Sequence, residues 1–317
     1  MIIVTGAAGF IGSQIALHLG LKENNPLILV DRFKYFNERK YTKPLVSTSQ
    51  HIEASKIFLS QLNDLKDISM IIHMGAITNT AASDVEELKE WNVNYTKSIW
   101  NYCTQKQIPM IYASSAATYG SGAEGFSDDH KQLMKLQPLN LYGKSKHEFD
   151  LFALSQIQTP PHWYGLKFFN VYGTGENHKA RMASSIWHGY NEIQSTGAMT
   201  LFKSHNPMFK DGEQARDFIY IKDILNIIDF LMIAKPQNGI YNCGTGVAGT
   251  FSELSKALFA TLEKPEKINW IETPKEFRSA YQYKTQADIS KLRSVGYTPH
   301  MTSLSAGVKD YVSKLKG

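Results

Sequence analysis

Tyr142 and Lys146 stand four residues apart in the stretch NLYGKSKHEFD, downstream of the serine pair Ser114 and Ser115 in YASSAATYG. Residues at this spacing share one face of a helix. A free tyrosine has a pKa near ~10, so a tyrosine base near neutrality needs that pKa lowered by about three units, or roughly 4 kcal/mol. A lysine cation one turn away is a source of such stabilisation, and a serine hydroxyl can hold a substrate oxygen during proton transfer. The pattern predicts a proton-transfer site; the alternative is a surface aromatic beside a solvated lysine.

Short apolar runs alternate with amphipathic segments along the first half of the chain. Buried strands are predicted at residues 1–5, 27–31, 69–75, 108–114 and 164–170. Helices are predicted at Ile11–Lys22, Asp84–Gln105 and Tyr142–Gln156, followed after about Val171 by a looser pattern, a strand at 218–221 and a helix near Asp223–Ile233. Such alternation is typical of a parallel sheet covered on both faces. The predicted fold class is α/β, a Rossmann-type doubly wound parallel sheet with a smaller, interleaved substrate-binding α/β domain.

A glycine-rich turn follows the first predicted strand. Gly6, Gly9 and Gly12 in VTGAAGFIGS form a GxxGxxG pattern between that strand and a helix. Glycine there permits a tight turn and the close approach of a pyrophosphate to a helix N-terminus. Asp31, at the end of the second predicted strand, stands where a carboxylate contacts the adenosine ribose. Dinucleotide binding is therefore predicted, whereas the alternative is a turn that only packs a helix against the sheet.

The residues around Asp31 leave the choice of dinucleotide open. A carboxylate favours a free ribose hydroxyl and hence NAD. Arg32 next to it, with Lys34, Arg39 and Lys40 close in sequence, could hold a ribose phosphate and hence NADP. From these residues alone both cofactors remain possible.

Composition limits the other classes of function. The chain has 317 residues, 43% of them hydrophobic and 20% charged, as in soluble globular proteins. A net charge of +5 without long basic runs argues against nucleic acid and fits an anionic small molecule. Cys103 and Cys243 lack metal-ligand spacing, which argues against a metal site and a disulfide framework. With neither a signal peptide nor a membrane-spanning run in the sequence, we expect a cytoplasmic protein without a membrane partner.

Several longer motifs together resemble the extended short-chain dehydrogenase/reductase family, which works on nucleotide sugars. They are MIIVTGAAGFIGS, YASSAATYG, NLYGKSK, FNVYGTGENHKARMAS, RDFIYIKD and YQYKTQAD. The likeness covers essentially the whole chain, and it implies a dinucleotide-binding domain at 1–169, 216–245 and about 282–294, with a substrate-binding domain at 170–215, 246–281 and 295–317. Ala116 and Ala117 stand where the dehydratases of this family place Asp and Glu. Elimination chemistry is therefore not expected.

The resemblance implies roles for individual residues. It assigns catalysis to Ser115, Tyr142 and Lys146, with Lys179 as a second base opposite Tyr142. The implied cofactor contacts are Gly6, Gly9, Phe10, Ile11, Gly12, Asp31, Arg32, Arg39, Met74, Gly75, Ala76, Ile77, Thr78, Asn92, Tyr142, Lys146, Val171 and Lys179. The implied substrate contacts are Ser115, Asn170, Arg181, His188, Phe202, Ser204, Arg216 and Tyr281.

Some of these residues also have plainer interpretations. Lys179 could be a solvated loop lysine, Asn170 a turn cap, His188 an exposed helix residue and Tyr281 a packing residue. Arg216 is expected to clamp the diphosphate of the substrate through two hydrogen bonds. The pattern departs from the family in two places: FKSHNPMFKDGEQARDF is longer than the usual loop, and Arg181 stands where a small residue is expected.

The resemblance implies an epimerase of an ADP-linked heptose that acts at carbon 6 with bound NADP, in the synthesis of lipopolysaccharide inner-core precursors. This reaction needs Lys179 because a ketone that rotates within the active site presents its oxygen to a different wall of that site. One alternative is a 4-epimerase of a UDP-sugar, which would use Ser115, Tyr142 and Lys146 without Lys179. Another is a non-catalytic dinucleotide-binding sensor. The resemblance also implies a homo-oligomer, specifically a pentamer.

Overall fold

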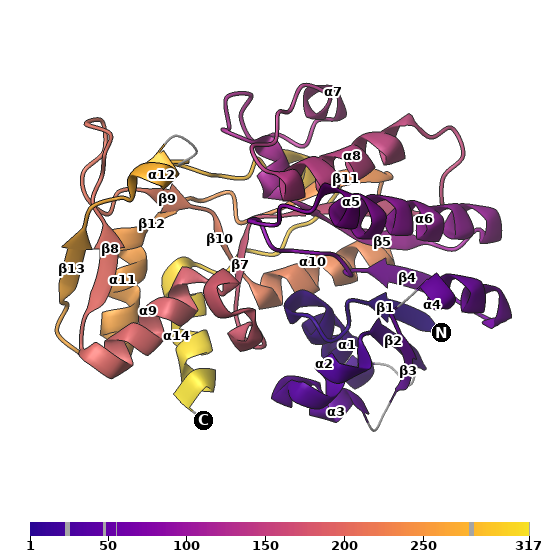
Figure 1. Ribbon diagram of the computed structural model, residues 1–317, viewed down its shortest axis with the longest axis horizontal. Coiled ribbons are helices and arrows are strands. Elements are labelled where there is room, and N and C mark those ends of the chain that lie inside the picture. Colours follow the sequence, from indigo (N-terminus) through magenta and orange to yellow (C-terminus); the bar gives the residue numbers. More distant parts are fainter. Residues whose placement is uncertain (23–25, 47–48, 55, 279–281, 317) are drawn as a thin grey trace.

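The computed structural model describes residues 1–22, 26–46, 49–54, 56–278 and 282–316. Its centre is a parallel sheet of seven strands in the order β11-β6-β5-β4-β1-β2-β3 (Figure 1). The strands are β1 (Ile2–Thr5), β2 (Leu27–Asp31), β3 (Gln50–Glu53), β4 (Met70–His73), β5 (Met110–Ser115), β6 (Trp163–Phe168) and β11 (Gly239–Cys243). The strand order reverses between β1 and β4, and ligands of open α/β sheets bind at the carboxyl end of such a switch point. The predicted doubly wound parallel sheet is confirmed.

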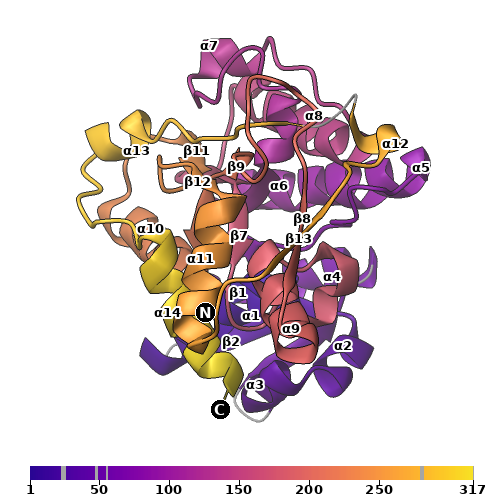
Figure 2. The same ribbon diagram turned by 90° about the vertical axis from the view of Figure 1, so that its left-hand side faces the viewer.

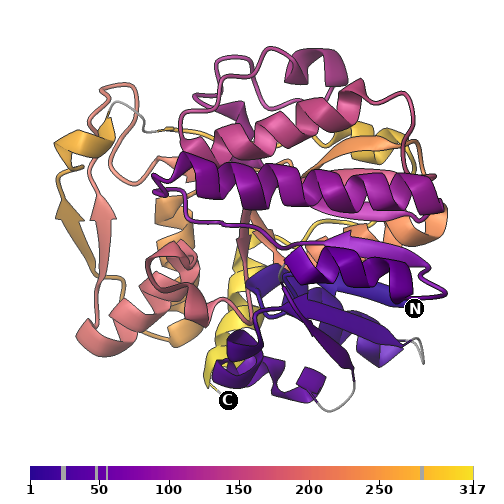
Figure 3. The same ribbon diagram turned by 45° about the vertical axis from the view of Figure 1, so that its right-hand side comes forward.

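Successive side chains of the central strands enter two different cores. Val4 of β1 packs with the helices α1 (Phe10–Lys22) and α10 (Ile221–Ala234) on one face of the sheet. Its neighbour Ile3 packs with α6 (Tyr95–Lys106) and α8 (Leu141–Ser155) on the other face. Figure 3 shows α6 and α8 running alongside each other across the sheet. Because both faces are covered, the strands are nearly continuous apolar runs in the sequence.

The helix that was predicted at Asp84–Gln105 contains an irregular turn. It begins as α5 (Val85–Leu88), where the Asp84 carboxylate accepts a hydrogen bond of 2.9 Å from the Glu87 amide. It then passes through a π-helical turn, Lys89–Asn94, before it continues as α6. Such turns are rare and are frequent at functional sites. This one carries Asn92, which is almost fully buried.

A second lobe lies at the carboxyl edge of the sheet, and Figure 2 faces it. Its core is α11, which packs against both α9 and α14. Three small two-stranded sheets, β7–β10, β8–β13 and β9–β12, complete the lobe and its border with the central sheet. Their elements are β7 (Asn170–Tyr172), α9 (Ser185–Thr196), β8 (Met199–Phe202), β9 (Ala215–Arg216), β10 (Phe218–Tyr220), β12 (Gly249–Thr250), α11 (Phe251–Leu262), β13 (Ile268–Ile271) and α14 (Leu304–Lys316).

The remaining elements are short and surround the sheet. They are the helices α2 (Phe33–Glu38), α3 (Lys43–Val46), α4 (Lys56–Gln61), α7 (His130–Leu133), α12 (Lys275–Arg278) and α13 (Ser290–Ser294). The 3-10 turns are Lys40–Thr42, Leu62–Asp64, Ala116–Tyr119 and Asn177–Met182. Within the described ranges, no helix has the length and apolar character needed to cross a membrane.

Candidate active site

The predicted catalytic serine and tyrosine meet at the carboxyl end of β5. Ser115 is the last residue of that strand and caps the 3-10 turn Ala116–Tyr119, where its Oγ accepts a hydrogen bond of 3.1 Å from the amide of Ala117. Its side chain also acts on that of Tyr142, in the first turn of α8, where it lowers the pKa of the phenol. That turn is held by Asn140, whose Oδ1 accepts a hydrogen bond of 2.7 Å from the amide of Gly143. The structure therefore brings the two predicted hydroxyl groups together.

The acidity of Tyr142 differs from the expectation based on sequence. Burial raises the pKa of Tyr142, the hydrogen bond from Ser115 lowers it less strongly, and the negative charge of Asp150 raises it further. The expected lowering by the Lys146 cation is therefore not found in the protein alone, because desolvation of a phenolate outweighs the favourable groups nearby. The protein by itself keeps Tyr142 protonated at neutral pH.

Lys146 lies one turn after Tyr142 and is buried, with 4% of its surface exposed. Its Nζ donates a hydrogen bond of 3.0 Å to the carbonyl of Ala113, in β5. Burial lowers the pKa of Lys146 to about 8, although the carboxylate of Asp150 opposes this change. The lysine thus sits with its ammonium against the strand that carries Ser115, and it is poised to lose its proton under mildly alkaline conditions.

The loop after β4 is tied to α8 by Asn92. Asn92 Oδ1 accepts a hydrogen bond of 2.8 Å from the amide of Ile77, and its Nδ2 donates to the Ile77 carbonyl at 3.0 Å. The same Nδ2 lies 3.0 Å from Ser145 Oγ, next to Lys146. Asn92 was predicted to contact the cofactor; the structure shows that it holds the predicted cofactor loop. The other loop residues run from buried Met74 through half-buried Gly75 and Ala76 to exposed Thr78.

The glycine turn between β1 and α1 leaves no room for larger side chains. Gly6 has a left-handed φ of +65°, and a Cβ there would lie 2.6 Å from the amide nitrogen of Gly75. A Cβ on Gly12 would lie 2.1 Å from the carbonyl oxygen of Gly6, and one on Gly9 would lie 3.0 Å from the same oxygen. The three glycines thus bring α1 close to the strand edge, with its first residues, Phe10 and Ile11, at the switch point. This is the geometry in which a helix N-terminus receives a pyrophosphate.

Asp31 closes this turn from the side. Its Oδ2 accepts a hydrogen bond of 2.9 Å from the amide of Ala8, and its Oδ1 accepts one of 2.8 Å from the amide of Arg32. Burial raises the pKa of Asp31, while these hydrogen bonds and the charges of Arg39 and Arg32 oppose the change. A carboxylate at the end of β2, next to the glycine turn, fits the ribose of a dinucleotide. The chain's residues thus fit the cofactor class that the sequence predicts.

A basic cluster surrounds the ring of Tyr35, just beyond Asp31. The guanidinium of Arg39 lies 4.0 Å from the ring centre, Lys34 Nζ 5.1 Å and the guanidinium of Arg32 6.0 Å. Arg39 also donates a hydrogen bond to the carbonyl of Ala8 in the glycine turn. The sequence provided the cations, but it gave no reason to expect that one aromatic ring would gather them.

The loop that carries Lys179 is braced by a buried carboxylate. Glu176 accepts hydrogen bonds from the amide of Gly173 at 3.1 Å and from Ser184 Oγ at 2.7 Å, and it also accepts one from the Ser184 amide. Both ends of the loop are thereby held to one side chain. Half-buried Lys179 places its Nζ 5.6 Å from the centre of the Phe10 ring, at the start of α1. Burial lowers the pKa of Lys179, and the charge of Glu176 opposes this.

A second contact joins this loop to the glycine turn. The hydroxyl of Tyr41 donates a hydrogen bond of 3.0 Å to the carbonyl of Ala8 and lies 2.6 Å from His178 Nδ1. Burial, together with the charges of Arg39 and Lys179, lowers the pKa of His178 to about 4, although a hydrogen bond to Gly175 opposes this. The imidazole is therefore neutral at neutral pH. The Lys179 loop is thus fixed beside the cofactor turn, which agrees with a place for Lys179 at the cofactor; its role as a second base stays a prediction.

The predicted substrate residues lie on several elements of the second lobe and its border. Asn170 is exposed in β7, next to half-buried Val171, which was predicted to contact the cofactor instead. Arg181 is exposed in the Lys179 loop, and His188 is exposed on α9. Phe202 ends β8 and is half-buried, and the hydroxyl of Ser204 donates a hydrogen bond of 2.8 Å to the Asn206 carbonyl within its own loop. Arg216 in β9 donates one of 2.9 Å to the carbonyl of Ala215. Tyr281 lies outside the described residues. The contacts of this set with substrate stay predictions.

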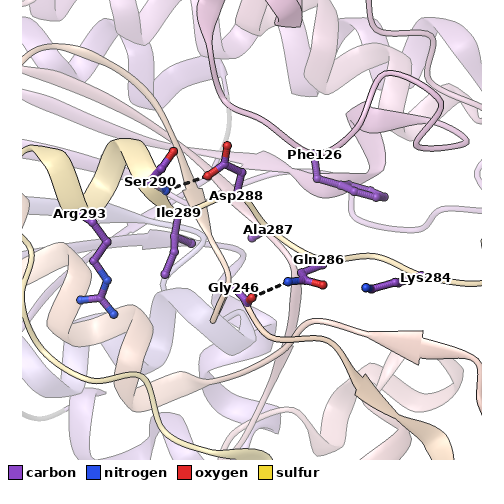
Figure 4. A pocket seen from close by; sticks show the side chains of 9 residues that line it. All are labelled: Phe126, Gly246, Lys284, Gln286, Ala287, Asp288, Ile289, Ser290 and Arg293. Atoms are coloured by element: carbon purple, nitrogen blue, oxygen red, sulfur yellow. Dashed lines mark hydrogen bonds between the residues drawn. The ribbon is translucent and has the colours of Figure 1, made fainter.

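A cavity of about 640 Å³ lies elsewhere, between the loop of Phe126 and the segment that leads into α13 (Figure 4). Its lining residues are Phe126, Gly246, Lys284, Gln286, Ala287, Asp288, Ile289, Ser290 and Arg293. A hydrogen bond of 2.8 Å from Gln286 to the carbonyl of Gly246 crosses it. None of the predicted site residues lines this cavity, so we assign it no part in the chemistry.

Comparison with known proteins places these features among relatives. The sequence pattern of the NAD dependent epimerase/dehydratase family matches residues 2–244. The chain is 45% identical to an ADP-L-glycero-D-manno-heptose-6-epimerase of Fusobacterium nucleatum, over 98% of this chain and 97% of that protein. The crystal structure of the Helicobacter pylori ADP-L-glycero-D-manno-heptose-6-epimerase superposes with a TM-score of 0.85 at 28% identity, over 100% of this chain and 96% of that one.

A more distant structure shares the fold. The UDP-glucuronic acid 4-epimerase of Bacillus cereus, in complex with UDP-glucuronic acid and NAD, has a TM-score of 0.77 at 23% identity and covers 99% of both chains. Its agreement with this chain extends to the doubly wound sheet and the second lobe. The catalytic geometry described above rests on this chain's own residues.

Proposed function

Because the chain belongs to the NAD dependent epimerase/dehydratase family, we propose that it interconverts ADP-D-glycero-β-D-manno-heptose and ADP-L-glycero-β-D-manno-heptose by transient oxidation at carbon 6. The observation that carries the proposal is the 45% identity with the Fusobacterium nucleatum heptose epimerase over nearly the whole length of both proteins. Ser115 at the end of β5, beside Tyr142 in the first turn of α8 and with Lys146 one turn further, is the local arrangement that such a reaction needs. The reaction would serve the synthesis of lipopolysaccharide inner-core precursors.

The chain's residues divide the chemistry between them. The glycine turn, Asp31 and the loop held by Asn92 would bind a nicotinamide dinucleotide. When bound, that cofactor supplies the acceptor for the hydrogen of carbon 6 and a positive charge that favours the ionised form of Tyr142. Ser115 would hold the oxygen on carbon 6, and Tyr142 would take the proton of that hydroxyl and later return it.

Lys179 would serve the other face of the substrate. An epimerase has to remove hydrogen from one face of carbon 6 and return it to the other, so the oxygen on that carbon faces two different walls during one turnover. Burial lowers the pKa of Lys179, and a lysine with a lowered pKa gives up its proton more readily. The brace from Glu176 to Gly173 and Ser184 would keep this lysine in place.

The proposed cofactor is NADP. Arg32, Lys34 and Arg39 gather around Tyr35 directly beyond Asp31, where a phosphate on the adenosine ribose would lie. Guanidinium groups bind phosphate through paired, charge-assisted hydrogen bonds. Release of the ligand from purified protein by heat, followed by identification by mass, tests the proposal. NAD alone, without stabilisation of the protein by added NADP, is the result that contradicts it.

A panel of substrates tests the proposed reaction. ADP-D-glycero-β-D-manno-heptose, UDP-glucose and UDP-N-acetylglucosamine are incubated separately with the protein, and the products are separated and identified by NMR. We expect the heptose to reach a mixture of its two epimers while the UDP-sugars stay unchanged. Turnover of a UDP-sugar with an inert heptose would instead identify a 4-epimerase.

The assembly and location of the protein are proposals that follow from the same function. We place the reaction in the cytoplasm, where nucleotide-activated sugars are made. We also propose that the chain forms a homo-oligomer, with five subunits as the sequence resemblance implies. Sedimentation velocity of the purified protein would measure the number of subunits.

A further inference from the structure

A fully buried ion pair lies directly behind the Ser115–Tyr142 pair. Lys167 in β6 and Asp150 in α8 have no exposed side-chain surface, and Lys167 Nζ lies 2.6 Å from Asp150 Oδ2. Two opposite charges are costly to remove from water, and their mutual attraction offsets that cost only with good geometry and further hydrogen bonds. The other hydrogen bonds of this ion pair therefore indicate which parts of the structure the buried charges hold in place.

The pair binds the chain on both sides of Ser115. Asp150 Oδ2 accepts a hydrogen bond of 2.6 Å from Ser114 Oγ, the residue before Ser115. Lys167 Nζ lies 2.6 Å from Thr118 Oγ1, and Thr118 Oγ1 donates a hydrogen bond of 2.8 Å to the carbonyl of Ser115. One ion pair thus sets the position of Ser115 through Ser114, the residue before it, and Thr118, three residues after it.

The same carboxylate belongs to the helix that carries the other catalytic groups. Asp150 lies one turn after Lys146 and two turns after Tyr142 on α8. Its Oδ1 also accepts a hydrogen bond of 3.1 Å from the hydroxyl of Tyr112 in β5. Asp150 therefore joins α8 to β5, so it controls how the Tyr142 hydroxyl meets that of Ser115.

The charges of the pair act on the catalytic groups. The carboxylate of Asp150 raises the pKa of Lys146 and that of Tyr142, in each case as a smaller effect than burial. Burial, helped by Lys146, lowers the pKa of His73 to about 3, and burial, helped by Lys291, lowers that of His130 to about 4. The remaining titratable groups on which Asp150 acts are Tyr112, Tyr119 and His147. Burial favours the neutral form of each of these groups.

We propose that Asp150 and Lys167 are positioning residues of the reaction, which hold Ser115 against Tyr142 and present the site with two balanced charges of opposite sign. Neither residue touches the substrate, and the assignment rests on the proposed function only for its effect on turnover. A purely structural pair would stabilise the fold, but removing its positive or its negative charge would not shift the pKa of Tyr142 in opposite directions. The test therefore removes one charge at a time.

The experiment compares Asp150→Asn with Lys167→Met. Loss of the carboxylate leaves the cations of Lys167 and Lys146, which lowers the pKa of Tyr142; loss of the ammonium leaves the Asp150 charge, which raises it. We expect shifts in opposite directions, on the order of half a pH unit or more. The pKa of Tyr142 is measured by following tyrosinate absorbance against pH in the absence of substrate. The curve of the same variant with the additional change Tyr142→Phe is subtracted, so that the difference reports Tyr142 alone. The pH profile of kcat should shift in the same two directions.

The controls separate the proposal from simple destabilisation. Glu148→Gln removes an exposed carboxylate of the same helix that lies 3.8 Å from Lys97, and it should leave the titration of Tyr142 unchanged. If a single variant fails to fold because it strands a buried charge, the double variant Asp150→Asn/Lys167→Met decides, since it buries no unpaired charge. A folded double variant with at least a tenfold lower kcat and an unchanged KM supports the proposal.

Two results would overturn it. One is a shift in the same direction, or no shift, in both folded single variants. The other is a double variant that keeps the wild-type rate and pH profile. Because the tyrosinate titration needs no substrate, it tests the proposal even if the wild-type protein does not epimerise the ADP-heptose, so the two failures are distinguishable.

Discussion

The side-chain amide of Asn92 pairs with both backbone groups of Ile77, accepting from its amide at 2.8 Å and donating to its carbonyl at 3.0 Å. Asn92 is 1% exposed and lies in a π-helical turn, whereas Ile77 lies in the loop predicted to contact the cofactor. A side chain thus supplies the hydrogen bonds that a neighbouring strand would otherwise provide. The π turn links the shape of that loop to α8, which carries Tyr142 and Lys146.

Asn92→Ala should therefore weaken both the fold and cofactor binding. It leaves two partly buried backbone groups of Ile77 without partners, which costs up to about 1–3 kcal/mol for each group that water does not reach. We expect a lower free energy of unfolding in urea and a roughly tenfold higher Kd for NADP. Asn94→Ala, an exposed position of the same turn, is the matched control and should change the free energy of unfolding by less than about 0.5 kcal/mol. Equal effects of the two changes would show that the pairing with Ile77 is unimportant.

The glycine turn provides a second matched pair of substitutions. Gly12→Ala places a Cβ 2.1 Å from the carbonyl oxygen of Gly6, so it should push α1 away from the turn and abolish cofactor binding. Gly20→Ala lies in the same helix, where the new Cβ meets only Leu27 Cδ1 at 3.7 Å. This control should stabilise the protein by about 0.5–1 kcal/mol, since alanine favours helix over glycine. Isothermal titration with NADP and thermal unfolding measure the two effects; unchanged NADP binding by Gly12→Ala would contradict the assignment.

The basic cluster around Tyr35 makes a prediction about cofactor choice. Arg32 is exposed, and its guanidinium lies 6.0 Å from the centre of the Tyr35 ring. Arg32→Ala should weaken NADP binding by roughly tenfold or more, the equivalent of one charge-assisted hydrogen bond, and leave NAD binding unchanged. Parallel titrations with the two dinucleotides measure this. An equal loss for both would mean that Arg32 does not recognise the ribose phosphate.

Lys179→Met should separate the two faces of the reaction. Loss of one general base costs about 10²–10⁴-fold in rate, so net epimerisation should nearly stop while the fold survives. An ADP-linked sugar aldehyde, which can be both oxidised and reduced, should still react at the face served by Tyr142. Lys256→Met, on the exposed side of α11, is the control. A near wild-type epimerisation rate of Lys179→Met would leave Lys179 as a solvated loop lysine.

Much of the fold could be predicted because local sequence patterns indicate its strands and helices. The apolar runs that became β1, β2, β4, β5 and β6 are buried on both faces and stand between helical segments. By contrast β3, with the sequence QHIE, was not predicted, since an edge strand needs no apolar run, and β8, β11 and β13 were also missed. Those strands form because each pairs with another strand, and that partner is brought alongside only when the chain folds.

In the site, too, some residues could be recognised from local sequence and others could not. Tyr142, Lys146, Ser115 and the glycine turn follow spacings that can be recognised in a sequence. Glu176, Asp150 and Lys167 act through contacts between distant segments, so their types alone carried no signal. In the protein alone, burial raises the pKa of Tyr142 despite the neighbouring lysine, so the lowering expected from the sequence depends on the charge of a bound cofactor.

The central claim is that carbon 6 of an ADP-linked heptose is oxidised and reduced again within one active site. The most direct measurement uses a substrate with deuterium at carbon 6 and follows the product by mass spectrometry and NMR, with Tyr142→Phe as the inactive control and Tyr190→Phe, on α9, as the matched one. The account predicts that the product keeps its deuterium at carbon 6, that Tyr142→Phe slows conversion by about 10²–10⁴-fold and that Tyr190→Phe leaves it unchanged. Exchange of the deuterium for solvent hydrogen, or conversion by Tyr142→Phe within tenfold of the wild-type rate, would contradict the account.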